Sequence, residues 1–325
     1  MTAKIMHISD GFEEAVEAAR AVLAKGLPVA IPTETVYGLA ADATDPLAVG
    51  RIYETKGRPQ FNPLICHMCD LGMAERYAHF DPISRHLAET FWPGPLTLIL
   101  PLKADSGIHA LATAGLDTVG LRVPKGFAAS LIRAFGRPLA APSANTSGRI
   151  SPTHAQHVAE DLGEKLELII DGDAAPVGVE STIVRVEDET IRLLRPGGIS
   201  AEELEAATGR TIVRPASPSA TIEAPGMLAS HYAPTAAVRL GAREVRPGET
   251  LISFGGLQVS GEDRATMVLN LSPAGDLREA TANLFDYLKK ADAATEVGIA
   301  VVPIPAHGLG EAINDRLSRA AAPRT

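Results

Sequence analysis

The feature that most constrains the fold is a regular alternation of short apolar runs with amphipathic helical patterns between residues 10 and 208. We expect strands over residues 28–32, 63–68, 96–102, 118–123, 138–141, 166–170, 181–186 and 190–194. We expect helices over residues 10–26, 46–55, 70–78, 81–91, 126–135, 152–162 and 200–208. This alternation predicts an α/β domain. Glu187-Asp188-Glu189 separates the last two strands as a hairpin turn would, so we expect a mixed sheet.

A Pro-rich segment then interrupts the pattern and divides the chain. We expect a catalytic domain over residues 1–209, a linker over 210–236 and a smaller α/β domain over 237–325. Apolar patterning in the last part predicts strands over 249–255, 266–271 and 296–305, and helices over 274–291 and 309–320. The linker contains Pro-Gly-Met and His231-Tyr232-Ala-Pro, and a flexible tether would not require such turn-forming and aromatic residues. We therefore expect the linker to pack back onto the protein.

Composition restricts the class of protein and the kind of partner. With 46% apolar and 21% charged residues, the chain has ordinary globular composition, and its aromatic content of 4% predicts a core of Ala, Leu, Val and Ile. The net charge of -9 argues against a surface that binds nucleic acid throughout. The sequence lacks a long apolar run or signal-peptide pattern, so we expect a cytoplasmic protein without a membrane span.

Several polar segments interrupt the apolar pattern where an anion could bind. Lys56 and Arg58 flank Gly57 after a predicted helix, which is equally compatible with an anion site and with a solvated helix end. Arg122 stands in an apolar strand and requires an anionic partner, either an internal carboxylate or one from a substrate. The small-residue loop 141–148 would let a phosphate or carboxylate approach closely, although it matches neither a P-loop nor GxGxxG.

The cysteines and the histidine between them have a simpler interpretation. Cys66 and Cys69 form a single CxxC, whereas a zinc site needs four ligands at closed spacing. We expect two buried or half-buried thiols. On residue type alone, His67 on a strand is more typical of a hydrogen-bonded core group than of a ligand.

These motifs together resemble one family. PTETVYGLAADA, KGRPQFNPL, WPGPLT, TVGLRVP, APSANTSG, ESTIVR and RPG occur in that order, and the set resembles the YrdC-like threonylcarbamoyl-AMP synthases. HYAP and the small α/β unit after it resemble the long, two-domain form. The resemblance covers essentially the whole chain and implies a YrdC-like twisted mixed sheet followed by a Rossmann-like C-terminal domain. One departure is ICHMC at residues 65–69, where the family pattern favours branched aliphatic residues beside the histidine.

The resemblance implies a reaction and a set of site residues. Members make L-threonylcarbamoyl-adenylate and pyrophosphate from L-threonine, bicarbonate or CO2, and ATP, for tRNA modification beside the anticodon. The family's KxR and SxN signature falls on Lys56, Arg58, Ser143 and Asn145. The threonine site would use Thr33, His67, Arg122, the backbone at Ala141, and Ser181 or Thr182. ATP would contact Arg58, Asn62, Thr118, Ser143, Ser151, Arg195, His231 and Tyr232.

The resemblance also implies cofactors and partners. Mg2+ would be held by the ATP phosphates and not by protein carboxylates, Arg122 would pair with the threonine carboxylate, and the linker would act as a lid. The product would pass to the tRNA threonylcarbamoyl-transferase machinery, while direct contact with tRNA stays open. An RNA-binding module without catalysis is the alternative, disfavoured by the net charge and by sparse basic runs. An O-carbamoyltransferase would additionally need an acylphosphatase-like unit and zinc-finger cysteines, which this sequence lacks.

Overall fold

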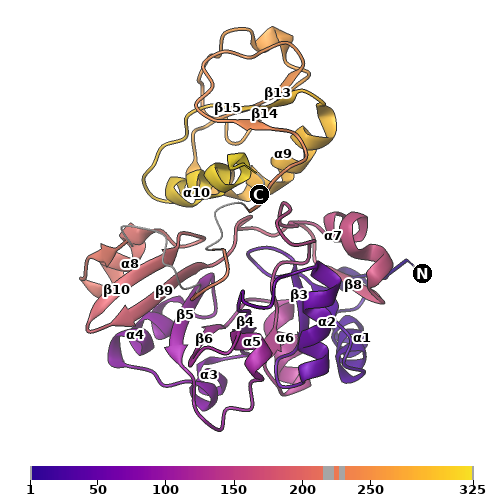
Figure 1. The fold of residues 1–325 in the computed structure, drawn as a ribbon, viewed down its shortest axis with the longest axis vertical. Helices are drawn as coiled ribbons and strands as arrows, with labels where there is room; N and C mark the ends of the chain where they lie inside the picture. Colours follow the sequence, from indigo (N-terminus) through magenta and orange to yellow (C-terminus); the bar gives the residue numbers. More distant parts are fainter. Residues whose placement is uncertain (1, 215–222, 227–230, 324–325) are drawn as a thin grey trace.

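The computed structural model describes residues 2–214, 223–226 and 231–323, which form two α/β units (Figure 1). The first unit contains a long mixed sheet with the strand order β1-β8-β2-β3-β7-β4-β6-β5-β9-β10-β11. Its strands are β1 (Lys4–His7), β2 (Val29–Ile31), β3 (Gly38–Asp42), β4 (Ile65–His67), β5 (Leu96–Pro101), β6 (Thr118–Arg122), β7 (Leu139–Ala140), β8 (Leu168–Asp171), β9 (Thr182–Glu187), β10 (Thr190–Arg195) and β11 (Ile212–Val213).

Both parallel and antiparallel pairs occur in this sheet, as predicted. Strands β9 and β10 pair antiparallel as the expected hairpin, whereas β5 and β9 pair parallel. Most helices of the unit follow the predicted pattern closely: α1 (Phe12–Ala24), α2 (Pro46–Lys56), α3 (Leu71–Tyr77), α4 (Pro82–Phe91), α6 (Phe127–Phe135), α7 (Ala155–Leu162) and α8 (Ala201–Thr208). The short helix α5 (Ala110–Thr113) lies outside the predicted ranges. The predicted fold class is therefore confirmed for this unit.

Four strands and one short helix were not predicted. Strand β3 follows residues 32–37, which continue directly from β2, and the two strands pair antiparallel. Its sequence, GLAAD, lacks the β-branched and aromatic residues that mark strands, so only its neighbours make it one. Strand β11 lies in the segment predicted to begin the linker and pairs with β10. Strands β1 and β12 and helix α5 are likewise too short to carry a clear periodicity.

The end of α2 shows how local sequence positions the site. Asp45 caps the helix by accepting a hydrogen bond from the Leu47 amide, and Pro46 occupies its first turn. Gly57 ends it in the left-handed conformation, with φ of 59°, which costs glycine little. The chain therefore turns sharply between Lys56 and Arg58, and the two cations take different directions.

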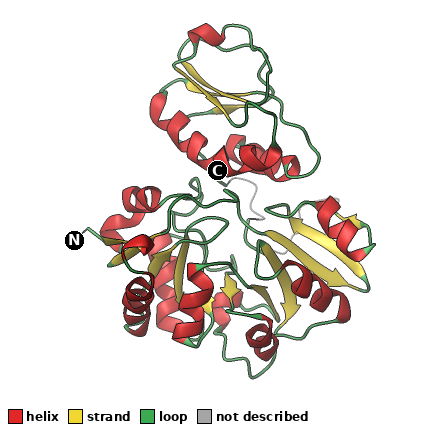
Figure 2. Cartoon of the chain, turned by 180° about the vertical axis from the view of Figure 1, so that it is seen from behind, coloured by secondary structure: helices red, strands yellow, loops and turns green. Residues whose placement is uncertain are grey.

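The second unit is a four-stranded parallel sheet with the order β12-β15-β13-β14. Its elements are β12 (Val238–Arg239), β13 (Glu249–Ser253), β14 (Met267–Asn270), α9 (Leu277–Ala294), β15 (Gly298–Val301) and α10 (Gly310–Ala321). The two helices lie on the side of this sheet that faces the first unit, as both ribbon views show (Figures 1 and 2). The parallel sheet with helical crossovers agrees with the predicted Rossmann-like unit.

The two units share buried apolar surface. The hydrophobic core of the second unit continues into the first through Val36, Ile150 and Val179. At Gly178 the backbones of the two units come so close that a Cβ added to this glycine would lie 2.5 Å from the Ala282 Cα of α9. A glycine is therefore required there for the two surfaces to meet. In the residues that the structure describes, no helix has the length and apolarity needed to cross a bilayer.

Candidate active site

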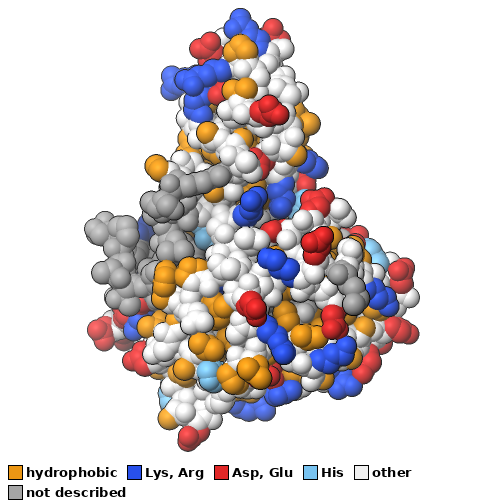
Figure 3. Space-filling view, turned by 45° about the vertical axis from the view of Figure 1, so that its right-hand side comes forward, with side chains coloured by type: hydrophobic (Ala, Val, Ile, Leu, Met, Phe, Trp, Pro, Cys, Tyr) orange, Lys and Arg blue, Asp and Glu red, His pale blue; other side chains and the backbone are white. Residues whose placement is uncertain are grey.

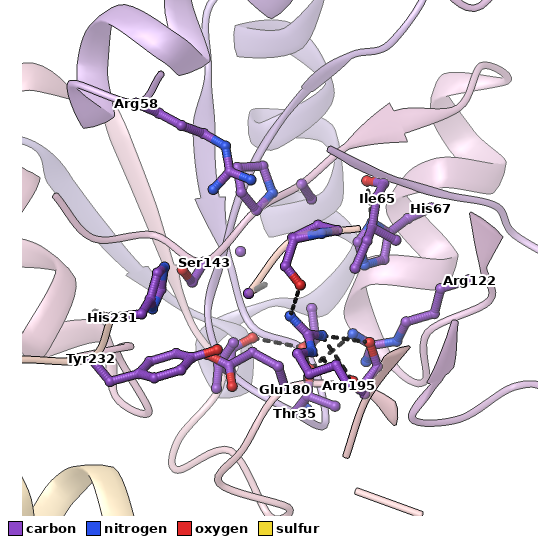
Figure 4. Close-up of a pocket in the computed structure, with 18 residues that line it drawn as sticks. Thr35, Arg58, Ile65, His67, Arg122, Ser143, Glu180, Arg195, His231 and Tyr232 are labelled. Carbon is purple, nitrogen blue, oxygen red and sulfur yellow. Dashed lines mark hydrogen bonds between the residues drawn. The ribbon is translucent and has the colours of Figure 1, made fainter. Parts of the chain in front are cut away.

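A cavity lies between the first unit and the linker, and it collects most of the predicted site residues (Figure 4). Ile65 and His67 are two residues apart in β4, so their side chains point to the same face of the sheet. The predicted residues that line the cavity are Thr33, Arg58, His67, Arg122, Ala141, Ser143, Ser181, Arg195, His231 and Tyr232. They come from segments far apart in the sequence, and Figure 4 shows Ser143 and His231 on one side and His67 and Arg122 on the other.

Arg122 has an internal carboxylate as its partner. Its Nη2 lies 2.8 Å from Glu34 Oε2, and both side chains are buried. Nη1 donates to Thr35 Oγ1 at 2.9 Å, and Nε donates to the Gly94 carbonyl at 3.3 Å. Glu34 therefore already supplies one negative charge to this buried arginine, and the expected pairing of Arg122 with a threonine carboxylate stays a prediction. Arg122 nevertheless lines the cavity and can face a second anion.

His67 is buried and neutral. Burial, together with the nearby Arg122 charge, lowers the pKa of His67 to about 3. Its Nδ1 lies 3.2 Å from the Ile65 carbonyl oxygen, so Nδ1 carries the proton and donates to that oxygen. The ring therefore lines the cavity as a neutral imidazole.

Lys56 does not line the cavity but lies behind the loop that does. Its Nζ donates to the carbonyl oxygens of Ser143, at 2.6 Å, and of Asn145. The Lys56 carbonyl in turn accepts a hydrogen bond from the Ser147 amide at 2.8 Å. Burial, reinforced by the charge of Arg58, holds the pKa of Lys56 well below its ordinary value. Lys56 thus joins the end of α2 to the Ser143 loop.

Two arginines supply cations at the cavity surface. Arg58 Nη2 donates to the Pro63 carbonyl at 2.9 Å, and Arg58 Nε donates to the Asn62 carbonyl at 3.2 Å. Arg195, at the end of β10, donates through Nη2 to the Ser181 carbonyl at 2.8 Å and to Ser181 Oγ at 3.2 Å. Neither guanidinium has a carboxylate ion-pair partner among the described residues. The cavity therefore has the positive charge that an anionic ligand requires.

The linker completes the cavity. Pro225, Gly226, His231 and Tyr232 all line it. Arg195 Nη1 donates to the Pro225 carbonyl at 3.3 Å, which ties the linker to β10. Tyr232 adopts a φ of 62° and is almost fully buried. The linker thus packs back onto the protein as predicted, although residues 215–222 and 227–230 lie outside the described residues.

The remaining predicted residues do not line the cavity. Asn145 Nδ2 donates to the Thr146 and Arg149 carbonyls and so shapes the loop after Ser143. Ser151 donates to Glu180, and Thr182 Oγ1 donates to the Ile199 carbonyl at 2.6 Å. Asn62 is buried and its carbonyl accepts the Arg58 bond. Thr118 begins β6, at the opposite end of that strand from Arg122.

Two carboxylates were missed by the sequence reasoning. Glu180 lines the cavity, and Glu34 holds Arg122 from behind. Both stood inside motifs already recognised, ESTIVR and PTETVYGL, so their position was available as a signal. A carboxylate beside an anion site opposes binding unless an arginine neutralises it, and Arg122 and Arg316 supply that neutralisation for Glu34 and Glu180.

The cysteines occupy the positions expected of ordinary thiols. Cys66 is buried, and burial raises the pKa of its thiol to about 12. Cys69 is half-buried beside Asp70 and Met73. Among the residues that the structure describes, no group of three or more His, Cys, Asp or Glu side chains is arranged to hold a metal ion.

Comparison with known proteins matches both units. The Sua5/YciO/YrdC family, described as Telomere recombination, matches residues 21–197, and the C-terminal domain of threonylcarbamoyl-AMP synthase matches residues 199–322. Threonylcarbamoyl-AMP synthase of Bacillus subtilis is 41% identical over 94% of this chain and 92% of its own length. The protein of that name from Pyrococcus abyssi is 41% identical over 97% of each chain.

Solved structures match over the same length. Pyrococcus abyssi Sua5 complexed with L-threonine superposes with a TM-score of 0.86 at 37% identity, over 98% of each chain. A variant of Sua5 in which a histidine and the tyrosine after it are replaced by alanine gives a TM-score of 0.88 at 37% identity, over 98% of this chain and 96% of the other. The chain therefore belongs to the threonylcarbamoyl-AMP synthase family, a family of nucleotidyltransferase-type enzymes, and matches it in both domains.

Proposed function

We propose that this chain makes L-threonylcarbamoyl-AMP and pyrophosphate from L-threonine, bicarbonate or CO2, and ATP. The observation that carries the proposal is one cavity that holds two kinds of group. Arg58 and Arg195 present cations without carboxylate partners among the described residues, while Arg122 and His67 form a separate polar corner. Such a cavity can bind a polyphosphate and a small amino acid side by side.

The threonine site in this proposal is the corner near β4 and β6. Thr33, His67, Arg122, the Ala141 backbone and Ser181 line it, and Thr182 supports it from behind. Arg122 would receive the threonine carboxylate on the side not occupied by Glu34. The solved complex of Pyrococcus abyssi Sua5 with L-threonine supports an amino-acid site in a relative of this fold.

The ATP site in this proposal lies towards Arg58, Ser143 and Arg195. Tyr232 and His231 would cover the nucleotide from the linker. Lys56 and Asn145 would act through the loop that carries Ser143, because their hydrogen bonds go to that loop. Asn62, Thr118 and Ser151 would contribute at its edges. ATP would arrive as its Mg2+ complex, with the ion held by the phosphates.

The chemistry has two steps, and both bring negative charge to one place. The threonine amine adds to CO2, forming an N–C bond and losing a proton, which gives a carbamate. A carbamate oxygen then attacks the α-phosphorus of ATP while the bond from that phosphorus to the β-phosphate oxygen breaks, so pyrophosphate leaves. Arg58 and Arg195 stabilise the charge on the phosphates. Cover from the linker residues His231 and Tyr232 limits the access of water to the carbamate.

The two-unit organisation serves the same reaction in this proposal. Residues 1–209 form the catalytic domain, 210–236 the lid and 237–325 the C-terminal domain. The product passes to the machinery that modifies tRNA beside the anticodon. Acidic and basic side chains are interspersed on the face seen in Figure 3, which favours small-molecule chemistry over a broad nucleic-acid surface.

Pyrophosphate release tests the proposal directly. With ATP and Mg2+ present, release should depend on both threonine and bicarbonate, and omission of either should abolish it. Threonylcarbamoyl-AMP should be detected by mass spectrometry in the complete mixture. Equal release without threonine would contradict the assignment and favour a plain nucleotide hydrolase.

A further inference from the structure

Arg316 of the C-terminal unit is buried behind the wall of the cavity, against the lining residue Glu180. It lies on α10, and its side chain is fully buried although it carries a charge. Nε donates to Glu180 Oε2 at 2.9 Å, and Nη1 donates to the Pro196 carbonyl at 2.9 Å. Asp315, its neighbour in the helix, accepts a second bond from Nη1 at 2.6 Å. Arg316 thus reaches from one unit into the other and contacts two of its segments.

Glu180 is the point where this contact meets the cavity. The carboxylate lines the cavity, and its other oxygen accepts a hydrogen bond from Ser151. Burial alone would raise the pKa of the Glu180 carboxyl, but Arg316 and Arg195 outweigh burial and lower it to about 2. Glu180 is therefore charged, and it needs Arg316 because a buried carboxylate without a cation is costly.

Tyr232 of the linker is held by the same arginine. The Arg316 guanidinium carbon lies 5.1 Å from the centre of the Tyr232 ring. The ring also stacks on Phe285 of α9, at 5.4 Å between ring centres. Both contacts come from the C-terminal unit, so the position of this cavity-lining tyrosine depends on docking of that unit.

We propose that Arg316 is a positioning residue through which the docked C-terminal unit builds the nucleotide side of the cavity. It fixes Glu180, the Pro196 backbone beside Arg195, and Tyr232 relative to one another. When the unit undocks, Glu180 loses its cation and Tyr232 loses both of these ring contacts. Nucleotide affinity is therefore coupled to docking. This inference rests on the proposed function for the identity of the nucleotide.

The test compares Arg316→Met with Arg239→Met in the full chain. Arg239 of β12 forms a bidentate pair with the buried carboxylate of Glu249, but this pair lies within the C-terminal unit and neither residue lines the cavity, so it is a matched control. Arg316→Met should raise the KM for ATP by about tenfold or more and the KM for threonine by less than about twofold. Arg239→Met should leave both within about twofold. Equal changes in the two variants would overturn the inference.

A double variant separates positioning from simple damage to the fold. Glu180→Gln and Arg316→Met should each weaken ATP binding, and the double variant should be no weaker than the worse single variant, because the two groups act as one unit. Losses that multiply would show independent roles and contradict the inference. Since the double variant removes both charges of the pair together, it should fold even if Arg316→Met alone does not.

Hydrogen exchange provides a readout that needs no ligand and no activity. Amides over residues 231–236 should exchange faster in Arg316→Met than in the wild type, and at the wild-type rate in Arg239→Met. Unchanged exchange in Arg316→Met would refute the inference even if the enzyme proves to use another nucleotide. Conversely, release of pyrophosphate by the wild-type protein without threonine would refute the proposed function, but it would not affect the hydrogen-exchange result for Arg316→Met.

Discussion

At the scale of single residues, the cavity depends on buried charges that neutralise one another. Arg122 with Glu34 and Arg316 with Glu180 are buried pairs, with separations of 2.8 and 2.9 Å. Taking one partner away leaves the other as an uncompensated charge, and this costs more than the intact pair contributes. Each of the two arginines therefore stabilises the fold before any ligand arrives.

The Arg122 pair yields a prediction about stability. Arg122→Met should lower the free energy of unfolding by about 3–5 kcal/mol, because Glu34 is left buried without a cation. The double variant Glu34→Gln, Arg122→Met should regain a large part of that loss. Urea unfolding of the single and double variants measures both values. A double variant as unstable as Arg122→Met would show that the loss comes from packing instead.

Two buried histidines yield a prediction about pH. Burial is the main cause that lowers the pKa of both His67 and His231 to about 3, so both stay neutral in the fold. The unfolded chain takes up protons below about pH 6.5 and the folded chain does not, so stability falls as the pH drops from there towards about 3. Between about pH 6.5 and 5.5 each histidine should cost about 1 kcal/mol. Urea unfolding at the two pH values measures this change in the free energy of unfolding. His67→Gln should remove the contribution of one histidine, which is about half of the change that the two histidines cause together.

At the scale of elements, the end of α2 and the loop after β7 form one structure. Lys56 joins them through two carbonyl oxygens, and Asn145 holds the loop from within. The two basic residues of the sequence motif KxR therefore have different roles. Arg58 faces the cavity, while Lys56 supports the loop that carries Ser143.

Replacement of Lys56 tests this division of roles. Lys56→Met should lower turnover at least about tenfold, equivalent to about 1.4 kcal/mol, because the Ser143 loop loses its anchor. Amides over residues 143–147 should also exchange faster. Lys103→Met is the matched control, since Lys103 likewise donates to a backbone carbonyl, that of Glu75, away from the cavity. Lowered turnover with unchanged loop exchange would instead place Lys56 in direct contact with substrate.

At the scale of the whole molecule, the two units are joined by a continuous apolar contact and by Arg316. Val36, which lines the cavity, belongs to the same hydrophobic cluster as the core of the C-terminal unit. Opening the interface would expose this surface and the buried Glu180 together. The docked arrangement is therefore the one in which the cavity is complete.

Gly178 allows docking to be tested without touching a charge. Gly178→Ala should separate the units, because its Cβ would lie 2.5 Å from the Ala282 Cα, in addition to the strain of a φ of 78°. Gly209→Ala has a similar φ of 65° with open space around the Cβ and is the matched control. Small-angle scattering should show a larger radius of gyration only for Gly178→Ala, with slower pyrophosphate release. Equal radii for both variants would mean that the interface yields locally.

By itself the sequence determined what is local in this protein. Strand and helix patterns established the α/β class of both units and the hairpin of β9 and β10, and the ordered motifs established the family and, through it, the Rossmann-like second unit. These features could be read because each depends on residues close together in the chain. Short strands such as β3 could not, because their pairing depends on distant neighbours.

Only the tertiary structure decided which charges meet. Ten of the predicted residues line one cavity, yet Lys56 lies behind it and Arg122 is already paired with Glu34. Arg316 carried no signal in the sequence, since it stands in an ordinary amphipathic helix and its partner Glu180 is 136 residues away. A buried ion pair depends on where two segments pack and on how little water remains between them. The spacing of residues along the chain gives no information on which segments pack together or on how much water lies between them. The link between the C-terminal unit and the cavity is therefore visible only in the folded molecule.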